Sequence, residues 1–230
     1  WAVFEDDVVA AIGACFDAMD ALYIADGHHR SAAAARIAET RRAKRPGYSG
    51  NEAFNGFLAV SFPDDGVEIL DYNRLVRDLH GHTPAALLAA LANDFDIRPR
   101  EVAVRPATPR SYGMYLAGNW YELTATTAID LNDPVARLDV SVLDHFVLAP
   151  LLGIENPRTS PRIDFVGGSR GPEAIEMRVD SGEMAVGFML HPTALSDLMS
   201  VADAGLIMPP KSTWFDPKLA DGLLSLPLDD

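Results

Sequence analysis

The sequence contains only one cysteine, Cys15, in 230 residues. A single cysteine excludes an intramolecular disulfide and a cysteine-rich metal site. Cys15 follows apolar residues at helical spacing, which is typical of a core position. The chain also lacks a run of about 20 apolar residues, the length that crosses a bilayer, and it shows no signal peptide. These absences predict a cytoplasmic protein that has no membrane partner.

Basic residues are scarce as well. The chain has 19 Lys and Arg against 33 Asp and Glu, a formal net charge of −14. Such a chain repels phosphate backbones, so binding to nucleic acid is disfavoured. Segment 26–45 is the exception, with six basic residues and two acids. This local excess suits a small anionic ligand, and the alternative is a solvated helix face.

Three familiar motifs are missing. The sequence has no G-x-x-x-x-G-K-[ST] phosphate loop and no G-x-G-x-x-G dinucleotide fingerprint. It also has no G-x-S-x-G elbow, which disfavours a serine hydrolase. The hydrophobic content of 48% is enough for one or two globular domains.

The patterns predict a mixed α/β (α+β) fold. In the first part of the chain, strands alternate with helices, an order typical of parallel strands joined by helices. The expected segments are strands at 1–4, 22–25 and 56–62 and helices at 6–19 and 28–44. Pro63 to Gly66 then predicts a hairpin turn between strands 56–62 and 67–70.

The rest of the chain predicts a mixed-sheet region with flanking helices. Residues 71–73 lead into a helical patch, and Thr83 predicts a capped helix over 85–91. Short β-prone runs between 101 and 127, Val102–Val104 among them, indicate antiparallel strands. Beyond them we expect helices at 138–152, 172–180 and 193–204, the last capped by Thr193, and strands at 162–166 and 183–190. We expect two units, residues 1–98 and 99–230, packed as one body.

Residues 26–30, Asp-Gly-His-His-Arg, lie at the expected junction between a strand and a helix. Free backbone N–H groups and the helix dipole favour an anion there, and Arg30 can bind phosphate in two places. The alternative is that Arg30 is a structural partner of Asp26 or of another buried carboxylate. Asp26 could cap the helix, orient a histidine, act as a base or bind Mg²⁺. His28 and His29 leave a helix about 100° apart, which is unsuited to holding one metal ion. We expect one histidine to act as a donor or acid/base group.

A second cluster comprises Lys211, Ser212, Thr213 and Lys218, in a loop with three prolines. We expect Lys211 to face an anion, in a pocket shared with Arg30. The alternative is an exposed turn stiffened by proline. The glycine-rich segment 167–171 is a weaker candidate, and His145 and His191 are expected to be structural.

Two stretches, 22–30 and 208–215 with Pro217-Lys218 and Gly222-Leu223, strongly resemble the bacterial and archaeal family known as domain of unknown function 1015. Residues 139–143, 162–166 and 180–182 fit its middle portion. Members of that family are longer, with a further N-terminal half that bears histidine-glutamate and lysine-glutamate motifs. The resemblance implies that this chain is a C-terminal half and that the other half is its partner at one pocket.

Gly27-His28-His29-Arg30 is also similar to the G-x-H-R turn of the ParB and sulfiredoxin superfamily, which includes free-serine kinases. The similarity implies a ParB/sulfiredoxin-like strand-turn-helix core, with phosphate contacts from Gly27, His29 and Arg30. His28 replaces the catalytic cysteine of sulfiredoxin, which disfavours that chemistry.

These observations predict a protein that binds a nucleotide or a phosphorylated metabolite, with ATP or ADP and Mg²⁺ as candidate cofactors. The kinase-like hypothesis has Asp26, His28 and His29 as catalytic residues that serve phosphate transfer to a small hydroxyl compound such as serine. The alternative is a non-catalytic, ParB-like module that senses a nucleotide. DNA binding is a third, disfavoured hypothesis, and a homo-oligomer stays open.

Overall fold

A computed structural model describes residues 2–220 and 222–228, and it divides the chain into two units. The first unit is residues 1–60 with 220–230, and the second is residues 61–219. Helices and antiparallel sheets together confirm the mixed α/β class. The boundary expected between residues 98 and 99 falls within strand β3 (Phe95–Arg100), whereas the two units meet between residues 60 and 61 and between 219 and 220.

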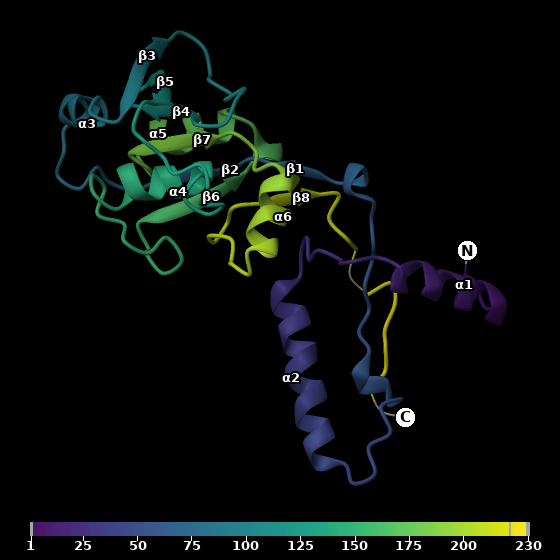
Figure 1. Cartoon of the computed structure of the whole chain (residues 1–230). Coiled ribbons are helices and arrows are strands. Elements are labelled where there is room, and N and C mark those ends of the chain that lie inside the picture. The colour runs from purple at the N-terminus through teal and green to yellow at the C-terminus, as the bar shows by residue number, and fades with distance from the viewer. Residues whose placement is uncertain (1, 221, 229–230) are drawn as a thin grey trace. The chain divides into compact units, whose positions relative to one another are not determined.

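The first unit contains two long helices, and both were expected. They are α1 (Asp6–Asp17) and α2 (His28–Lys44), followed by a short 3₁₀ turn, η1 (Ala53–Asn55). Both helices are drawn in purple and blue in Figure 1.

The strands expected in this unit are wrong wherever the structure describes them. Residues 2–4, 22–25 and 56–62 form no strand, while Trp1 lies outside the described residues. Strand propensity reflects packing on a pleated, half-buried surface. Nothing supplies that surface here, since Ile24 and Phe57 are about half exposed. The parallel strand-helix arrangement is therefore not formed.

The second unit is built on a six-stranded antiparallel sheet of order β3-β5-β4-β7-β2-β6 (Figure 1). A separate two-stranded sheet pairs β1 with β8. Besides β3, the strands are β1 (Glu68–Leu70), β2 (Tyr72–Val76), β4 (Ser111–Leu116), β5 (Asn119–Ala125), β6 (Ile163–Gly167), β7 (Val186–Leu190) and β8 (Trp214–Asp216).

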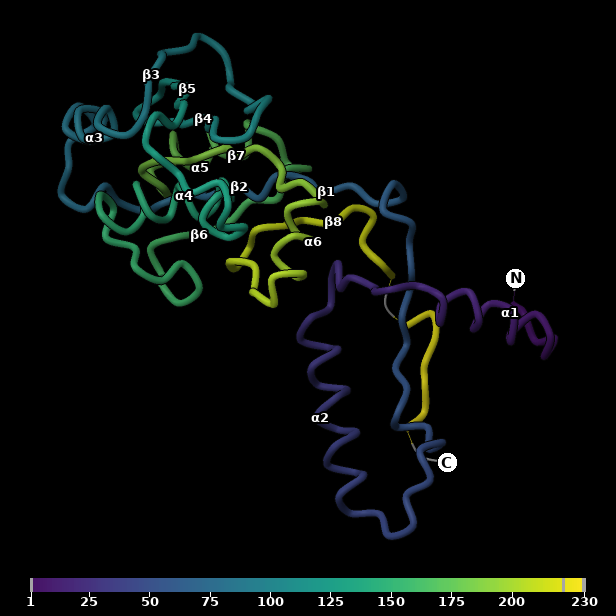
Figure 2. The backbone as a smooth tube through the Cα atoms, in the orientation of Figure 1, coloured from purple at the N-terminus to yellow at the C-terminus, as the bar shows by residue number. Residues whose placement is uncertain are grey.

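Helices α3 to α6 accompany this sheet, and the backbone tube in Figure 2 follows the same path. They are α3 (Pro84–Leu91), α4 (Asp139–Leu143), α5 (Glu173–Asp180) and α6 (Leu195–Asp203). Helix α4 continues into a π-helical turn, η3 (Asp144–Leu148). The remaining 3₁₀ turns are η2 (Asp64–Gly66) and η4 (Gly168–Arg170).

Side chains of the six-stranded sheet alternate between two buried clusters, as the period of a strand requires. In β7, Phe188 packs in a cluster with α3, α4 and η3, whereas Met189 packs in a cluster with α5. In β2, Leu75 and Val76 divide in the same way and are fully buried. Both faces of the sheet are therefore covered.

Several local expectations for this unit are wrong. The turn at 63–66 forms, but it closes no hairpin, because β1 pairs with β8. Residues 71–73 enter strand β2 rather than a helix, and Val102–Val104 is not a strand. Thr193 does not cap α6: its Oγ1 donates to the carbonyl of Ser212. These outcomes depend on partners that are distant in the sequence.

Candidate functional site

The turn at residues 26–30 opens helix α2. Gly27 is the N-cap residue, with a φ of +88° that favours glycine. Oδ1 of Asp26 accepts a hydrogen bond of 2.8 Å from the Gly27 N–H. Asp26 therefore stabilises the turn from the position before the N-cap. Gly27 itself has no side chain that could bind the helix amides.

The first amides of α2 are directed out of its N-terminal end. The first intrahelical bond runs from the Ser31 N–H to the Gly27 carbonyl, at 2.9 Å. The N–H groups of His28, His29 and Arg30 precede it, and the positive end of the helix dipole lies at the same place. This helix of 17 residues thus begins with donors that suit an anion.

The guanidinium of Arg30 folds back over this turn. Its Nη2 and Nε lie 3.0 and 3.1 Å from the position that a Cβ atom on Gly27 would occupy. His28, His29 and Arg30 are all exposed. The structure therefore brings the five predicted residues together at one accessible turn. A Mg²⁺ ion here would need phosphate oxygens in addition to Asp26, because it prefers six oxygen ligands.

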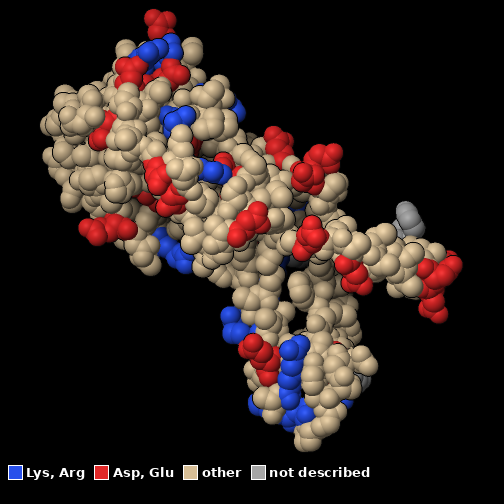
Figure 3. Space-filling view, viewed as in Figure 1, with Lys and Arg blue, Asp and Glu red and all other residues tan. Residues whose placement is uncertain are grey.

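Three other basic residues of segment 26–45 lie far from the turn. Arg41, Arg42 and Lys44 lie in the last turn of α2, and Lys and Arg gather over that half of the helix in Figure 3. Twelve residues of helix separate Arg42 from Arg30 by about 18 Å. Nε of Arg42 donates to Oδ1 of Asn55 at 2.9 Å. These cations complement the negative end of the helix dipole instead.

The predicted loop at 208–218 lies in the second unit and carries two lysines above aromatic rings. Nζ of Lys211 lies 5.4 Å from the ring centroid of Tyr72, and Nζ of Lys218 lies 5.4 Å from that of Trp214. Both contacts are of cation–π type. Both lysine residues are exposed, and each ammonium group faces an aromatic ring.

The hydroxyl of Ser212 has a structural role. Ser212 is buried, and its Oγ donates to the Pro209 carbonyl at 2.7 Å. Thr213 is half-buried beside it. The loop belongs to the second unit and the turn at 26–30 to the first, so a pocket shared by Arg30 and Lys211 stays a prediction.

The glycines of segment 167–171 allow close packing. A Cβ atom on Gly167 would lie 2.7 Å from the ring of Trp214, and one on Gly168 would overlap the carboxylate of Asp71. Contact with side chains accounts for these glycines without a phosphate ligand.

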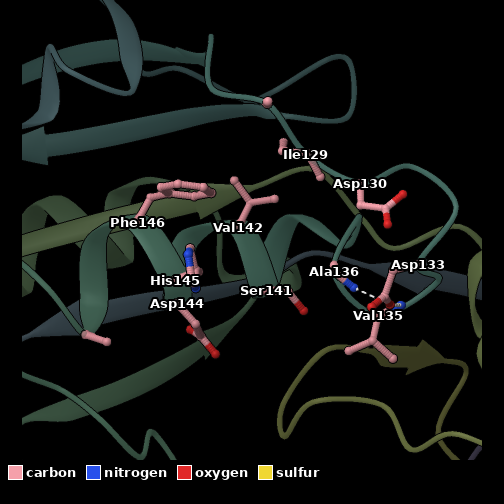
Figure 4. A pocket seen from close by; sticks show the side chains of 12 residues that line it. Ile129, Asp130, Asp133, Val135, Ala136, Ser141, Val142, Asp144, His145 and Phe146 are labelled. Carbon is pink, nitrogen blue, oxygen red and sulfur yellow. Dashed lines mark hydrogen bonds between the residues drawn. The ribbon is translucent and has the colours of Figure 1, made fainter.

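A pocket of about 530 Å³ in the second unit was missed by the sequence patterns (Figure 4). It lies against α4 and η3, and its lining includes Ser141, Asp144 and His145. Burial raises the pKa of Asp144 to about 6, and the charge of Arg74 opposes this rise. Arg74 itself is 2% exposed, and burial lowers its pKa to about 10.

A second carboxylate with a buried oxygen lies at the start of α4. Burial raises the pKa of Asp139 to about 7, against the opposing effect of a hydrogen bond from the Arg110 N–H to Oδ1. Acids in the largely apolar segment 138–152 were the available signal for this region. His145, expected to be structural, is exposed at the pocket.

These features define a mixed α/β protein with an anion-favouring helix start in its first unit and an acidic pocket in its second. The chain belongs to the family described as protein of unknown function (DUF1015), whose model matches residues 1–141. The match includes the turn at 26–30 and ends before the loop at 208–218. No helix in the described part of the chain has the length and apolar character of a membrane span.

Solved structures similar to this chain include a free serine kinase in complex with AMP, at 12% identity and a TM-score of 0.42, covering 93% of this chain and 81% of the kinase. A mutant free serine kinase with AMP gives 12% identity, a TM-score of 0.40 and coverage of 83% and 66%. This chain thus spans just under two thirds of that mutant's length. A conserved hypothetical protein from Pyrococcus furiosus gives 12% identity, a TM-score of 0.41 and coverage of 86% and 71%. The curated proteins contain no match.

Proposed function

We propose that the turn at residues 26–30 binds the phosphate of a nucleotide or of another small phosphorylated compound. The observation that carries this proposal is the placement of the Arg30 guanidinium over Gly27, where α2 presents its first amides. A charge-assisted hydrogen bond contributes about 1.5–3 kcal/mol and a helix terminus about 0.3–1 kcal/mol. Their sum approaches the roughly 4 kcal/mol of millimolar affinity.

The finer proposal is phosphate transfer from ATP or ADP to a small hydroxyl compound such as serine. Asp26, His28 and His29 would then supply proton transfer, and Mg²⁺ bound through Asp26 and the phosphates would offset charge. Lys211 and Lys218 would take part only if their loop faces the same ligand. A nucleotide sensor without catalysis is the second candidate, favoured by the bond that ties Asp26 to the Gly27 amide.

The binding proposal is tested by titrating ADP into the full 230-residue chain by isothermal calorimetry. We expect Arg30→Ala to weaken ADP binding at least tenfold, since about 1.4 kcal/mol corresponds to tenfold. Arg36→Ala is the matched control: Arg36 is exposed on the same helix, about 9 Å further along its axis. It should change affinity less than twofold. Equal affinities of the two variants would overturn the proposal.

Phosphorus NMR distinguishes the two candidates. Incubation of the chain with ATP or ADP, Mg²⁺ and serine should give phosphoserine if the turn catalyses transfer. Thermal stabilisation by nucleotide without any product would favour the sensor.

A further inference from the structure

The loop between α6 and β8 (Figure 1) contains a lysine in a backbone conformation that few residues other than glycine adopt. Lys211 has a φ of +58°, in the left-handed region. Oγ of Ser212 donates to the carbonyl of Pro209 at 2.7 Å, across the turn that contains Lys211. Oγ1 of Thr193 donates to the carbonyl of Ser212 at 3.0 Å. Two side-chain hydrogen bonds therefore hold the turn around this lysine.

The contacts of the Lys211 side chain do not account for the backbone strain. Its ammonium group lies 5.4 Å from the centroid of the Tyr72 ring, and Lys211 is exposed. A cation–π contact at an exposed site contributes less than a left-handed lysine costs. Among the residues that the structure describes, no hydrogen bond or ion pair holds this ammonium group. Strained residues that their surroundings hold in place are typical of functional sites.

The backbone amides around Lys211 lack acceptors. In residues 2–220 and 222–228, the N–H groups of Lys211, Ser212 and Thr213 make no hydrogen bond. Ser212 is 5% exposed, and buried amides are paired almost without exception. A residue in the left-handed helical region directs its own N–H and the next one to the same side, an arrangement that binds anions.

Other left-handed residues of this chain show which acceptor such an amide takes. The N–H of His80 donates to Oδ1 of Asp78 at 2.9 Å, and the N–H of Arg110 donates to Oδ1 of Asp139 at 2.8 Å. In both cases the acceptor is a carboxylate oxygen of the chain itself. No carboxylate of the described chain takes this place at Lys211. The position therefore suits an oxyanion that comes from outside the chain.

We propose that Lys211, Ser212 and Thr213 form a site for a phosphate group, either free or carried by a small compound as a monoester. The three N–H groups donate to the phosphate oxygens, and the Lys211 ammonium group compensates their charge. A phosphate group offers more acceptor oxygens than a carboxylate, so it can use these donors together. This site lies in the second unit, so the proposal does not depend on the one made for the turn at 26–30.

The test is an NMR titration of the full chain that carries Arg30→Ala, so that the turn at 26–30 does not contribute. The probes are inorganic phosphate, glycerol phosphate and acetate, and the amide signals of Lys211, Ser212 and Thr213 are followed. We expect both phosphates to shift these signals in a saturable way and to bind about tenfold more tightly than acetate. The tighter of the two phosphates shows whether the site prefers the free or the esterified group. Unchanged signals, or acetate binding as tight as phosphate binding, would overturn the proposal.

Lys211→Gly separates the ammonium group from the backbone. Glycine adopts the left-handed conformation without strain, so the amides stay in place. We expect this variant to bind phosphate about tenfold more weakly and to unfold at or above the temperature of its parent. Should it fail to fold, Lys211→Asn takes its place, because asparagine also tolerates this conformation. Unchanged phosphate affinity in the folded variant would overturn the assignment to Lys211.

Arg110→Gly is the matched control. It removes an exposed cation from another left-handed position and keeps the N–H that Asp139 accepts. It should leave phosphate binding unchanged. Lys211→Gly in a chain that retains Arg30 should keep the ADP binding proposed for the turn at 26–30, so the two proposals fail separately.

Discussion

Asp139 of α4 and Asp144 of η3 each have one buried carboxylate oxygen. Oδ2 of Asp139 is buried without a hydrogen-bond partner among the described residues, although Oδ1 accepts from the Arg110 amide. Desolvation disfavours the ionised carboxylate and raises its pKa from 3.8 to about 7. This carboxylate therefore destabilises the folded chain at neutral pH.

The direction of this effect with pH follows from linkage. A carboxyl whose pKa is raised by folding stabilises the folded state most below its unfolded pKa, near pH 4, and this contribution is lost as pH rises through about 7. Asparagine keeps the acceptor for Arg110 and carries no charge. We expect Asp139→Asn to gain stability relative to the parent between about pH 4 and 8, by about 1–4 kcal/mol.

Urea unfolding at several pH values measures this difference. Asp96→Asn is the control, since it removes the same charge from an exposed position and should give a difference that varies little with pH. A pH-independent difference for Asp139→Asn would contradict the raised pKa.

Among single residues, the sequence predicts those whose conformation depends on near neighbours in the chain. The αL conformation of Gly27 and the position of Arg30 at the start of a helix depend on a few neighbours in the chain, so the turn was visible in the pattern. Asp144 was not, because its environment depends on Arg74, on a strand far back in the chain. Local patterns do not report such burial.

Helices and strands also differ in how far the local sequence predicts them. The bounds of α2 and α3 were predicted closely, since capping and helix propensity act within a few residues. The segments 22–25 and 56–62 have strand propensity without a neighbouring strand, and they stay irregular. Strand β3 was missed, and its Pro99 is tolerated because β3 is an edge strand.

The cap of α3 provides a test at this scale. Oγ1 of Thr83 accepts a hydrogen bond of 3.2 Å from the Ala86 N–H. We expect Thr83→Ala to lower the free energy of unfolding by about 1 kcal/mol, and Thr83→Ser to retain most of it. Denaturant titration of both variants measures the loss. An equal loss in the two would show that the methyl group, rather than the hydroxyl, stabilises the helix start.

The whole molecule distributes its core unevenly. Both buried clusters lie between residues 75 and 201, within the second unit. In the described part of the first unit, the buried residues are Ala38, Glu52 and Phe54. Hydrophobic burial is the main stabilising contribution to folding, so the second unit has its own source of stability.

We therefore expect residues 61–219 to fold as an isolated fragment. The amide signals in its NMR spectrum should be dispersed. Its thermal unfolding, followed by circular dichroism, should be cooperative. The fragment should also lack the ADP binding that depends on Arg30, which lies outside it. A fragment with a collapsed, undispersed spectrum would show that the first unit is needed for folding.

The pairing of β1 with β8 has a further consequence. Glu68 lies opposite Asp216 and Leu70 opposite Trp214, so the chain enters and leaves the second unit at neighbouring strands. A unit whose ends meet adds little loop-closure entropy when it is spliced into another chain. It is built as a transferable insert, and a short peptide joining its ends would allow new termini to be opened in one of its surface loops.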